Sequence, residues 1–229
     1  MRAIGVLGGM GPEATLDFLA KLYAADTAPC EQERLRVLVD CNPAVLDRNA
    51  AVTGAGPSPG PILAAMARGL EASGAACLVI ACNTAHAWSA DVRSAVGIPL
   101  IDMIETACAE VAQRVPRARR VGLLAGDGCL AAGIYQRALA RRDLHAVVPG
   151  QDARAGFMEA LYQIKAGRAG ATEKAALLAY VRETEEAGAE VVIAACTEVP
   201  LLLTQADVSL PMIDAGEVLA KHAAAWARA

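Results

Sequence analysis

The chain has 229 residues, of which 55% are hydrophobic and only 3% aromatic, and its formal net charge at pH 7 is −4. This length fits one large domain or two small ones, with a core built from aliphatic side chains. The negative charge disfavours a general nucleic-acid-binding protein, although a local site of opposite sign can still bind a small anion. The longest apolar stretch, residues 75–82, is far too short to cross a bilayer, so we expect no membrane partner.

The seven cysteines and the first residues of the chain bear on its location. The cysteine count is odd, several cysteines lie in apolar runs, and no Cys-x-x-Cys pair or histidine cluster suggests a metal. Glycines interrupt the first apolar run and no cleavage pattern follows it, which is not typical of a signal peptide. We therefore expect a cytoplasmic protein that holds no metal.

Short apolar runs alternate along the chain with longer helical patterns, and Pro12 and Glu13 suit the first turn of the first helix. A loop rich in Gly and Pro is expected at 54–61. In chain order, the expected elements are a strand at 4–7, a helix at 12–23, a strand at 35–39, a helix at 61–73, a strand at 77–81, a helix at 104–114, a strand at 121–124, helices at 133–141, 154–165 and 173–186, a strand at 191–194 and a helix at 216–226. This alternation favours an α/β fold with parallel sheets.

Three pairs of segments repeat in the same order at nearly one spacing. RAIGVL at 2–7 resembles RRVGLL at 119–124, GAACLVIAC at 74–82 resembles GAEVVIAAC at 188–196, and Pro-Leu-Ile-Asp at 99–102 resembles Pro-Met-Ile-Asp at 211–214. Buried parallel strands share apolar residues, but that likeness does not account for the repeated Gly-to-Cys spacing. We therefore predict two similar, pseudo-symmetric α/β domains with an interdomain active-site cleft. Residues 1–100 plus 211–229 would form the first domain and 101–210 the second.

Each long repeat ends on a cysteine, Cys82 in the first and Cys196 in the second. Ligands on parallel sheets bind beyond the carboxyl ends of the strands, so two facing halves would set the two thiols across one cleft. Racemisation needs a base on one face of a carbon and an acid on the other, and two thiols can exchange these roles. Cysteine has a reference pKa of about 8.5, which a helix N-terminus can lower. A lone cysteine at a strand end is more often a small buried residue, but these two occupy matching places.

The sequence also resembles a known family, the aspartate/glutamate racemases, and specifically the aspartate racemase branch. The resemblance covers nearly the whole chain and rests on GGMGPEAT at 8–15, NP at 42–43, DR at 47–48, CNTAH at 82–86 and CTEVP at 196–200. The glutamate branch carries Asp-Ser-Gly in place of GGM and a His at the position of Glu198. The resemblance implies a two-domain fold, activity on a small amino acid without pyridoxal phosphate or metal, and a homodimer.

The resemblance further implies which residues bind the substrate. Arg48 would hold the distal carboxylate with its guanidinium fork, and Lys165 matches a family lysine near the substrate. Met10 with the glycine loop would form a wall of the pocket, and Asn42 would contribute to binding. From the residues alone, Arg48 could equally form a surface ion pair, and Lys165 could simply end a helix before a glycine.

Polar residues that follow the two cysteines complete the expected site. Asn83, Thr84 and Thr197 would bind the α-carboxylate, or would otherwise cap helices. His86 and Glu198 would tune the thiols, or would otherwise be ordinary polar residues of first turns.

The second glycine loop departs from the family pattern, which commonly reads Ala-Thr-x-Gly-Thr. Gly126 and Cys129 replace the two threonines, and Asp127 adds a negative charge. Asn49 also stands where threonine is usual after Asp-Arg. These changes leave the cysteine pair intact but bear on the substrate, so a broad-specificity racemase is an alternative.

Two further alternatives remain open at this point. A maleate isomerase or hydantoin racemase of the same superfamily also uses cysteines at such positions. A binding protein that keeps an amino-acid pocket without turnover belongs to a different class, and the presence of both cysteines argues against it because binding needs neither.

Overall fold

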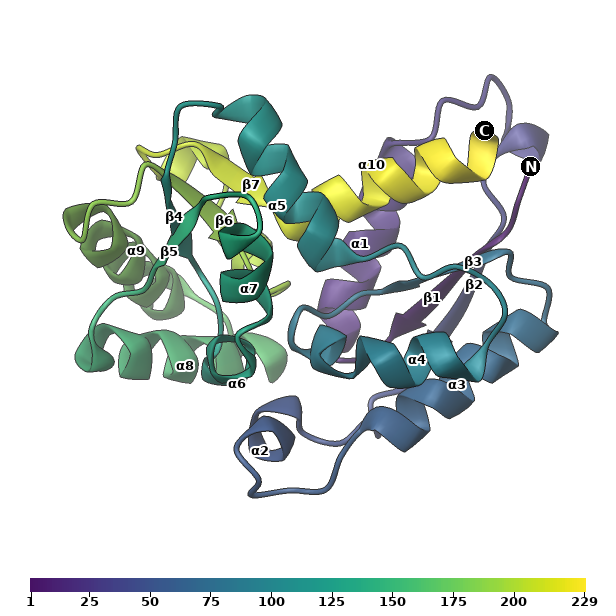
Figure 1. The fold of residues 1–229 in the computed structure, drawn as a ribbon, viewed down its shortest axis with the longest axis horizontal. Coiled ribbons are helices and arrows are strands. Elements are labelled where there is room, and N and C mark those ends of the chain that lie inside the picture. The colour runs from purple at the N-terminus through teal and green to yellow at the C-terminus, as the bar shows by residue number, and fades with distance from the viewer.

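Two parallel β-sheets organise the protein, whose computed structural model describes residues 1–229. The first sheet has the strand order β2-β1-β3 and the second β5-β4-β6-β7, and every pair is parallel. The strands are β1 (Ile4–Gly8), β2 (Val37–Cys41), β3 (Cys77–Ile80), β4 (Arg120–Leu123), β5 (His145–Val147), β6 (Val191–Ala194) and β7 (Met212–Asp214). The expected α/β class with two parallel sheets is confirmed (Figure 1).

Helices surround both sheets (Figure 1). They are α1 (Pro12–Ala24), α2 (Arg48–Val52), α3 (Gly60–Ala72), α4 (Ser89–Ala95), α5 (Met103–Arg114), α6 (Asp127–Ala132), α7 (Ile134–Ala140), α8 (Gln151–Lys165), α9 (Ala171–Glu186) and α10 (Ala215–Arg228). None of them combines the length and the apolar character that crossing a membrane requires.

The repeat in the sequence corresponds to a repeat in the topology. In both sheets the first strand of the half lies between the second and the third. Gly5 of β1 and Gly122 of β4 hold matching places, where an added Cβ atom would lie 2.7 Å from Leu78 and 2.9 Å from Val192, respectively. The repeated glycine therefore has a packing cause, because the neighbouring strand and helix approach the backbone too closely for a side chain.

The last pair of repeated segments, 99–102 and 211–214, ends each sheet and leads into a long helix. Leu100 forms a parallel bridge beside β3, and Met212 of β7 pairs with β6. Asp102 and Asp214 then accept hydrogen bonds from backbone N–H groups at the starts of α5 and α10. The shared geometry of strand end and helix cap explains why these four residues recur.

The two long helices each cross to the opposite half. Helix α5 contacts α7 and β7, whereas α10 packs against α1 and runs back toward the N-terminus (Figure 1). The expected domain division placed all of 211–229 with the first half. Because β7 pairs with β6 of the second sheet, this strand belongs to the second half. The chain therefore returns to the first half at Ala215, where α10 begins, and not before residue 211. One cluster of 33 buried residues includes Ile4 and Val121, so the two halves share a core.

The expected elements differ from the observed ones mainly where elements are short. Strand β2 begins two residues later than expected, because buried Leu35 lies in the preceding loop with its N–H bonded to Asp26. Strands β5 and β7, of three residues each, were not predicted, nor were the short helices α2, α4 and α6. Such short elements carry too few residues for a period to be recognised.

Candidate active site

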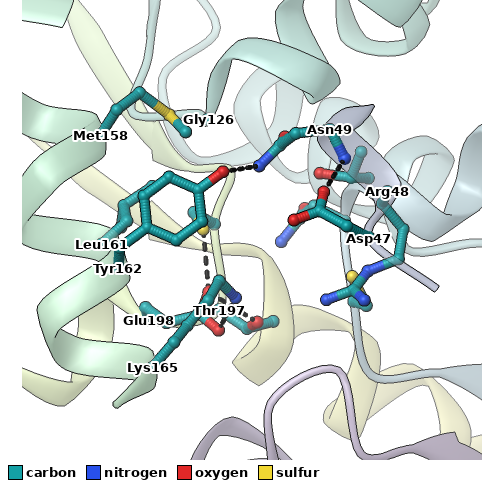
Figure 2. A pocket seen from close by; sticks show the side chains of 14 residues that line it. Asp47, Arg48, Asn49, Gly126, Met158, Leu161, Tyr162, Lys165, Thr197 and Glu198 are labelled. Atoms are coloured by element: carbon teal, nitrogen blue, oxygen red, sulfur yellow. Dashed lines mark hydrogen bonds and ion pairs between the residues drawn. The ribbon is translucent and has the colours of Figure 1, made fainter. Parts of the chain in front are cut away.

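A cavity of about 50 Å³ lies where loops of the two halves meet (Figure 2). Both repeated cysteines line it. Its walls come from the start of α2, the segments after β3 and β6, the second glycine loop and one face of α8. The lining residues are Asp47, Arg48, Asn49, Cys82, Asn83, Thr84, Gly126, Met158, Leu161, Tyr162, Lys165, Cys196, Thr197 and Glu198.

Cys82 lies just beyond the end of β3 and is 6% exposed. The segment that follows is a short 3₁₀ turn over Thr84–Trp88, and the turn after Cys196 is likewise 3₁₀. Such short turns supply only a weak helix dipole, so the groups around each thiol matter more.

His86 contacts the backbone of Cys82 and not its thiol. Its Nδ1 lies 2.9 Å from the Cys82 carbonyl oxygen, and its Nε2 accepts the N–H of Met103 at 3.2 Å. These partners place the single proton on Nδ1. Burial lowers the pKa of His86, so the ring is neutral near pH 7. The imidazole therefore ties the strand end that carries Cys82 to the start of α5.

Cys196 has a charged neighbour. Its thiol donates a hydrogen bond to Oε2 of Glu198 at 2.9 Å, and Oε1 of the same carboxylate is ion-paired with Lys165. Burial raises the pKa of Cys196 well above its usual value, and the charge of Glu198 raises it further, against the opposing effect of Lys165. Burial lowers the pKa of Lys165 and is the largest single effect, but the charges of Glu198, Cys196 and Cys82 and the hydrogen bond to Glu198 together outweigh it, so the net shift is upward. Lys165 is therefore a charged ammonium already paired within the site.

Arg48 is held by backbone oxygens at the base of α2. One guanidinium nitrogen, Nη1, donates to the carbonyls of Val45 and Leu46 at 2.9 and 3.0 Å, and Nη2 donates to Met10 at 3.4 Å. Asp47 caps the same helix by accepting two backbone N–H groups. A guanidinium has five N–H donors, so the Nε donor and one Nη2 donor remain without a protein partner in a residue that lines the cavity.

Asn49 connects the two halves across the cavity (Figure 2). Its Oδ1 accepts the backbone N–H of Gly128 at 3.0 Å, and its Nδ2 donates to the hydroxyl of Tyr162 at 3.2 Å. A Cβ atom at Gly128 would collide with Oδ1 and lie 2.8 Å from the Cα of Asn49. The unexpected asparagine and the glycine loop are therefore in direct contact.

The other departures in the second glycine loop do not change the charge of the cavity. Asp127 forms an ion pair with Arg154 at 2.7 Å and does not line the cavity. Cys129 is 1% exposed in the shared core, and burial raises the pKa of its thiol. Neither residue adds a charge at the cavity wall.

Most of the expected site residues lie together, and three do not. Met10 is buried in the core of the first half, and only its carbonyl oxygen reaches the site, through Arg48. The side chain of Asn42 accepts the N–H of Ala44 at 3.0 Å in a local turn, and His86 faces the backbone. Arg48, Asn83, Thr84, Lys165, Thr197 and Glu198 all line the cavity with the two cysteines.

Three lining residues of α8 were not predicted: Met158, Leu161 and Tyr162. They lie seven, four and three positions before Lys165, respectively, so all four occupy one face of the helix. That spacing is the signal that could have identified them. No group of three or more His, Cys, Asp or Glu side chains is placed to hold a metal.

A family model described as "Asp/Glu/Hydantoin racemase" matches residues 7–223. The broad specificity amino-acid racemase RacX of Bacillus subtilis is 24% identical over an alignment 234 positions long, which covers 95% of each chain. A glutamate racemase of Corynebacterium kroppenstedtii is 34% identical over 141 residues, covering 60% of this chain and 47% of that one.

The solved structures that match include an aspartate racemase of Picrophilus torridus. It superposes with a TM-score of 0.87 at 25% identity, over 98% of this chain and 95% of that one. A glutamate racemase of Francisella tularensis in complex with D-glutamate has a TM-score of 0.67 at 18% identity, over 98% of this chain and 80% of that one, which shows a shared fold alone.

Proposed function

Because this chain belongs to the Asp/Glu/hydantoin racemase family and is an amino-acid racemase, we propose that it interconverts the L and D forms of aspartate or glutamate through two cysteines. The observation that carries the proposal is that Cys82 and Cys196, from matching positions of two repeated halves, line one cavity together with Arg48. Neither thiol is needed to bind an amino acid, whereas both are needed to exchange its α-proton between faces.

The reaction moves one proton to and one proton from the α-carbon. One sulfur, as thiolate, takes the α-proton as the C–H bond breaks, and the electron pair moves toward the carboxylate. The other sulfur, as thiol, gives its proton to the opposite face of the same carbon. The first sulfur is then the thiol and the second the thiolate, so their roles are exchanged for the reverse reaction.

The polar groups beside the thiols would bind the substrate's α-carboxylate. Asn83, Thr84 and Thr197 line the cavity next to the two cysteines and carry N–H or O–H donors. Donors that approach a carboxylate stabilise it more as negative charge builds up on its oxygens, and so lower the barrier to proton removal.

The substrate's side chain would meet Arg48. Its two unpaired donors suit a carboxylate, whereas Lys165 is already neutralised by Glu198. A dicarboxylic amino acid is therefore the substrate that the charges favour.

A broader substrate range is the second candidate. Asn49, Met158, Leu161 and Tyr162 form a neutral wall of the same cavity, with the hydroxyl of Tyr162 already bonded to Asn49. Such a wall offers no charge to select an acidic side chain and suits apolar or amide side chains equally. RacX, the relative that matches over 95% of both chains, is named for broad specificity.

We also propose that the enzyme works without pyridoxal phosphate or a metal, and as a homodimer in the cytoplasm. Activity should survive a chelator and a carbonyl reagent, and should be lost on alkylation of thiols. Light scattering on the purified protein would give the oligomeric state.

Exchange in deuterated water tests the central proposal. L-aspartate, L-glutamate and L-alanine are each incubated with the enzyme, and the α-proton signal and the optical activity are followed together. We expect deuterium at the α-carbon and formation of the D form, fastest for the acidic substrates. An α-proton that stays in place with all three would reduce the protein to a binding role. In a parallel incubation with maleate, its conversion to fumarate would favour a maleate isomerase instead.

A further inference from the structure

The side-chain amide of Asn83 has one satisfied end and one unsatisfied end. Asn83 follows Cys82, lines the cavity and is only 2% exposed. Its Oδ1 accepts a hydrogen bond from the hydroxyl of Tyr135 at 2.6 Å, whereas its Nδ2 has no partner in the protein. A buried amide N–H₂ without an acceptor is costly, so an acceptor is missing at this position.

Tyr135 determines which end of the amide is left free. It is fully buried on α7, and its hydroxyl has the Asn83 oxygen as its one hydrogen-bond partner. Burial raises the pKa of Tyr135 well above its usual value, so the hydroxyl keeps its proton and must donate it. If the amide were flipped, the hydroxyl oxygen could accept a bond from Nδ2, but the phenolic proton would lose its one acceptor in a fully buried place. The phenolic proton therefore keeps Oδ1 toward Tyr135 and the two N–H donors away from it.

We propose that Tyr135 is a positioning residue that holds the Asn83 amide with its N–H₂ group toward a carboxylate oxygen of the substrate, beside Cys82. This inference rests on the proposed racemase function and deepens it. Tyr135 belongs to the second half and Asn83 to the first, so the orientation of a binding group in one half depends on contact with the other. The carboxylate donor is therefore set correctly only when the halves are together.

Tyr135→Phe keeps the ring and removes only the proton that orients the amide. The expected result is a KM for aspartate or glutamate that rises about fivefold to tenfold, with a much smaller change in kcat. In an Asn83→Ala background the same change should have no further effect, because the two residues act as one unit. Tyr180→Phe is the matched control: Tyr180 is equally buried and its hydroxyl donates to the Leu123 carbonyl at 3.2 Å, outside the cavity.

Asn83→Asp tests the orientation without changing Tyr135. The hydroxyl can still donate to one oxygen, but the other, facing the cavity, becomes a negative acceptor. We expect carboxylate affinity to fall at least about a hundredfold, further than in Asn83→Ala, because like charges then meet in a buried site. This variant also decides the matter if Tyr135→Phe does not fold.

Calorimetry with succinate, a dicarboxylate that cannot be racemised, separates this inference from the proposed function. If the wild type binds succinate and both variants weaken it, the positioning role stands even if no amino acid is turned over. A Tyr135→Phe enzyme with the wild-type KM would overturn the inference. So would Tyr135→Phe raising KM as much in the Asn83→Ala background as in the wild type, or Tyr180→Phe raising KM as much as Tyr135→Phe does. So would a wild type that does not bind succinate.

Discussion

Cys82 and Cys196 occupy matching positions in the two halves but have unlike neighbours. Cys196 donates to a buried carboxylate, Glu198, which is paired with Lys165. The corresponding place after Cys82 holds Thr84, and the nearby His86 is a neutral ring bonded to the backbone. The repeat therefore reproduces the path of the backbone but not the charges around the sulfurs. The two thiols of the proposed mechanism therefore have different electrostatic surroundings.

Replacing either sulfur should have the largest effect. Cys82→Ser and Cys196→Ser should each lower racemisation of aspartate at least about a thousandfold, because a hydroxyl is far too weak an acid to form the needed base near neutral pH. Elimination from β-chloroalanine needs only proton removal. It should persist for one enantiomer in one variant and for the other enantiomer in the other variant, measured as pyruvate released from each.

Normal racemisation in either serine variant would refute the pairing. Cys129→Ser is the matched control, because Cys129 is a buried thiol of the second glycine loop and does not line the cavity. It should keep the proton-transfer steps. If it alone abolishes them, the second sulfur of the pair has been misassigned.

The next prediction compares the two cationic side chains of the cavity, Arg48 with its unpaired donors and Lys165 with its partner Glu198, as binding groups for an acidic substrate. Arg48→Ala should lower kcat/KM for aspartate about a hundredfold and for alanine less than about threefold, because only the acidic side chain uses the free donors. Arg48→Lys keeps the charge but loses the fork, so its value should be intermediate. Equal losses on both substrates would mean that Arg48 supports the fold of α2 through Val45 and Leu46 rather than the substrate.

The sequence predicts the part of this site that depends on repetition. Continuous apolar runs predict β1, β3 and β6, and the Gly-to-Cys spacing predicts that the two thiols share a cavity. The wall of α8 was missed, because Met158 and Leu161 share a helix face with Lys165 but have the same spacing as ordinary core residues, so the spacing becomes a signal only once Lys165 is taken to face the site.

Contacts between the halves could not be predicted at all. Asn49 was recognised as unusual in its motif, but nothing local indicates that its amide bonds to Gly128 and Tyr162. The bond from Tyr135 to Asn83 likewise joins residues that lie far apart in the sequence. Such pairs form only when two halves that fold around a shared core come together.

The pH dependence of elimination gives a third test of the difference between the two thiols. Glu198→Gln keeps the size of the side chain and removes its charge. That charge raises the pKa of Cys196, and without it the ammonium of Lys165 acts on the sulfur unopposed, so both changes lower the pKa of the thiol. More thiolate is then present at a given pH. The rising limb of the elimination rate for the enantiomer served by Cys196 should move to lower pH, and the limb for the other enantiomer should stay in place. A shift of both limbs would mean that the two thiols titrate as a coupled pair.

The smallest effects should come from alanine substitutions at the two matching glycines, Gly5 and Gly122. These variants compare how tightly each half is packed and do not touch the cavity. In Gly5→Ala the new methyl group would lie 2.7 Å from Leu78 and 2.9 Å from Ala75, and in Gly122→Ala it would lie 2.9 Å from Val192 and closer still to Thr184. Overpacking of this kind costs about 1–3 kcal/mol of unfolding free energy. We expect the larger loss for Gly122→Ala, because Thr184 is fully buried and its hydroxyl is bonded to Tyr180, so it cannot turn away. Each lost kcal/mol corresponds to a fall in melting temperature of about 2–4 °C for a chain of this size, measurable by thermal unfolding.

Because the halves share a core, both variants should still unfold in a single transition. Two separate transitions in Gly122→Ala would show that the halves are independent units, and that α5 and α10 join two domains instead of completing one core.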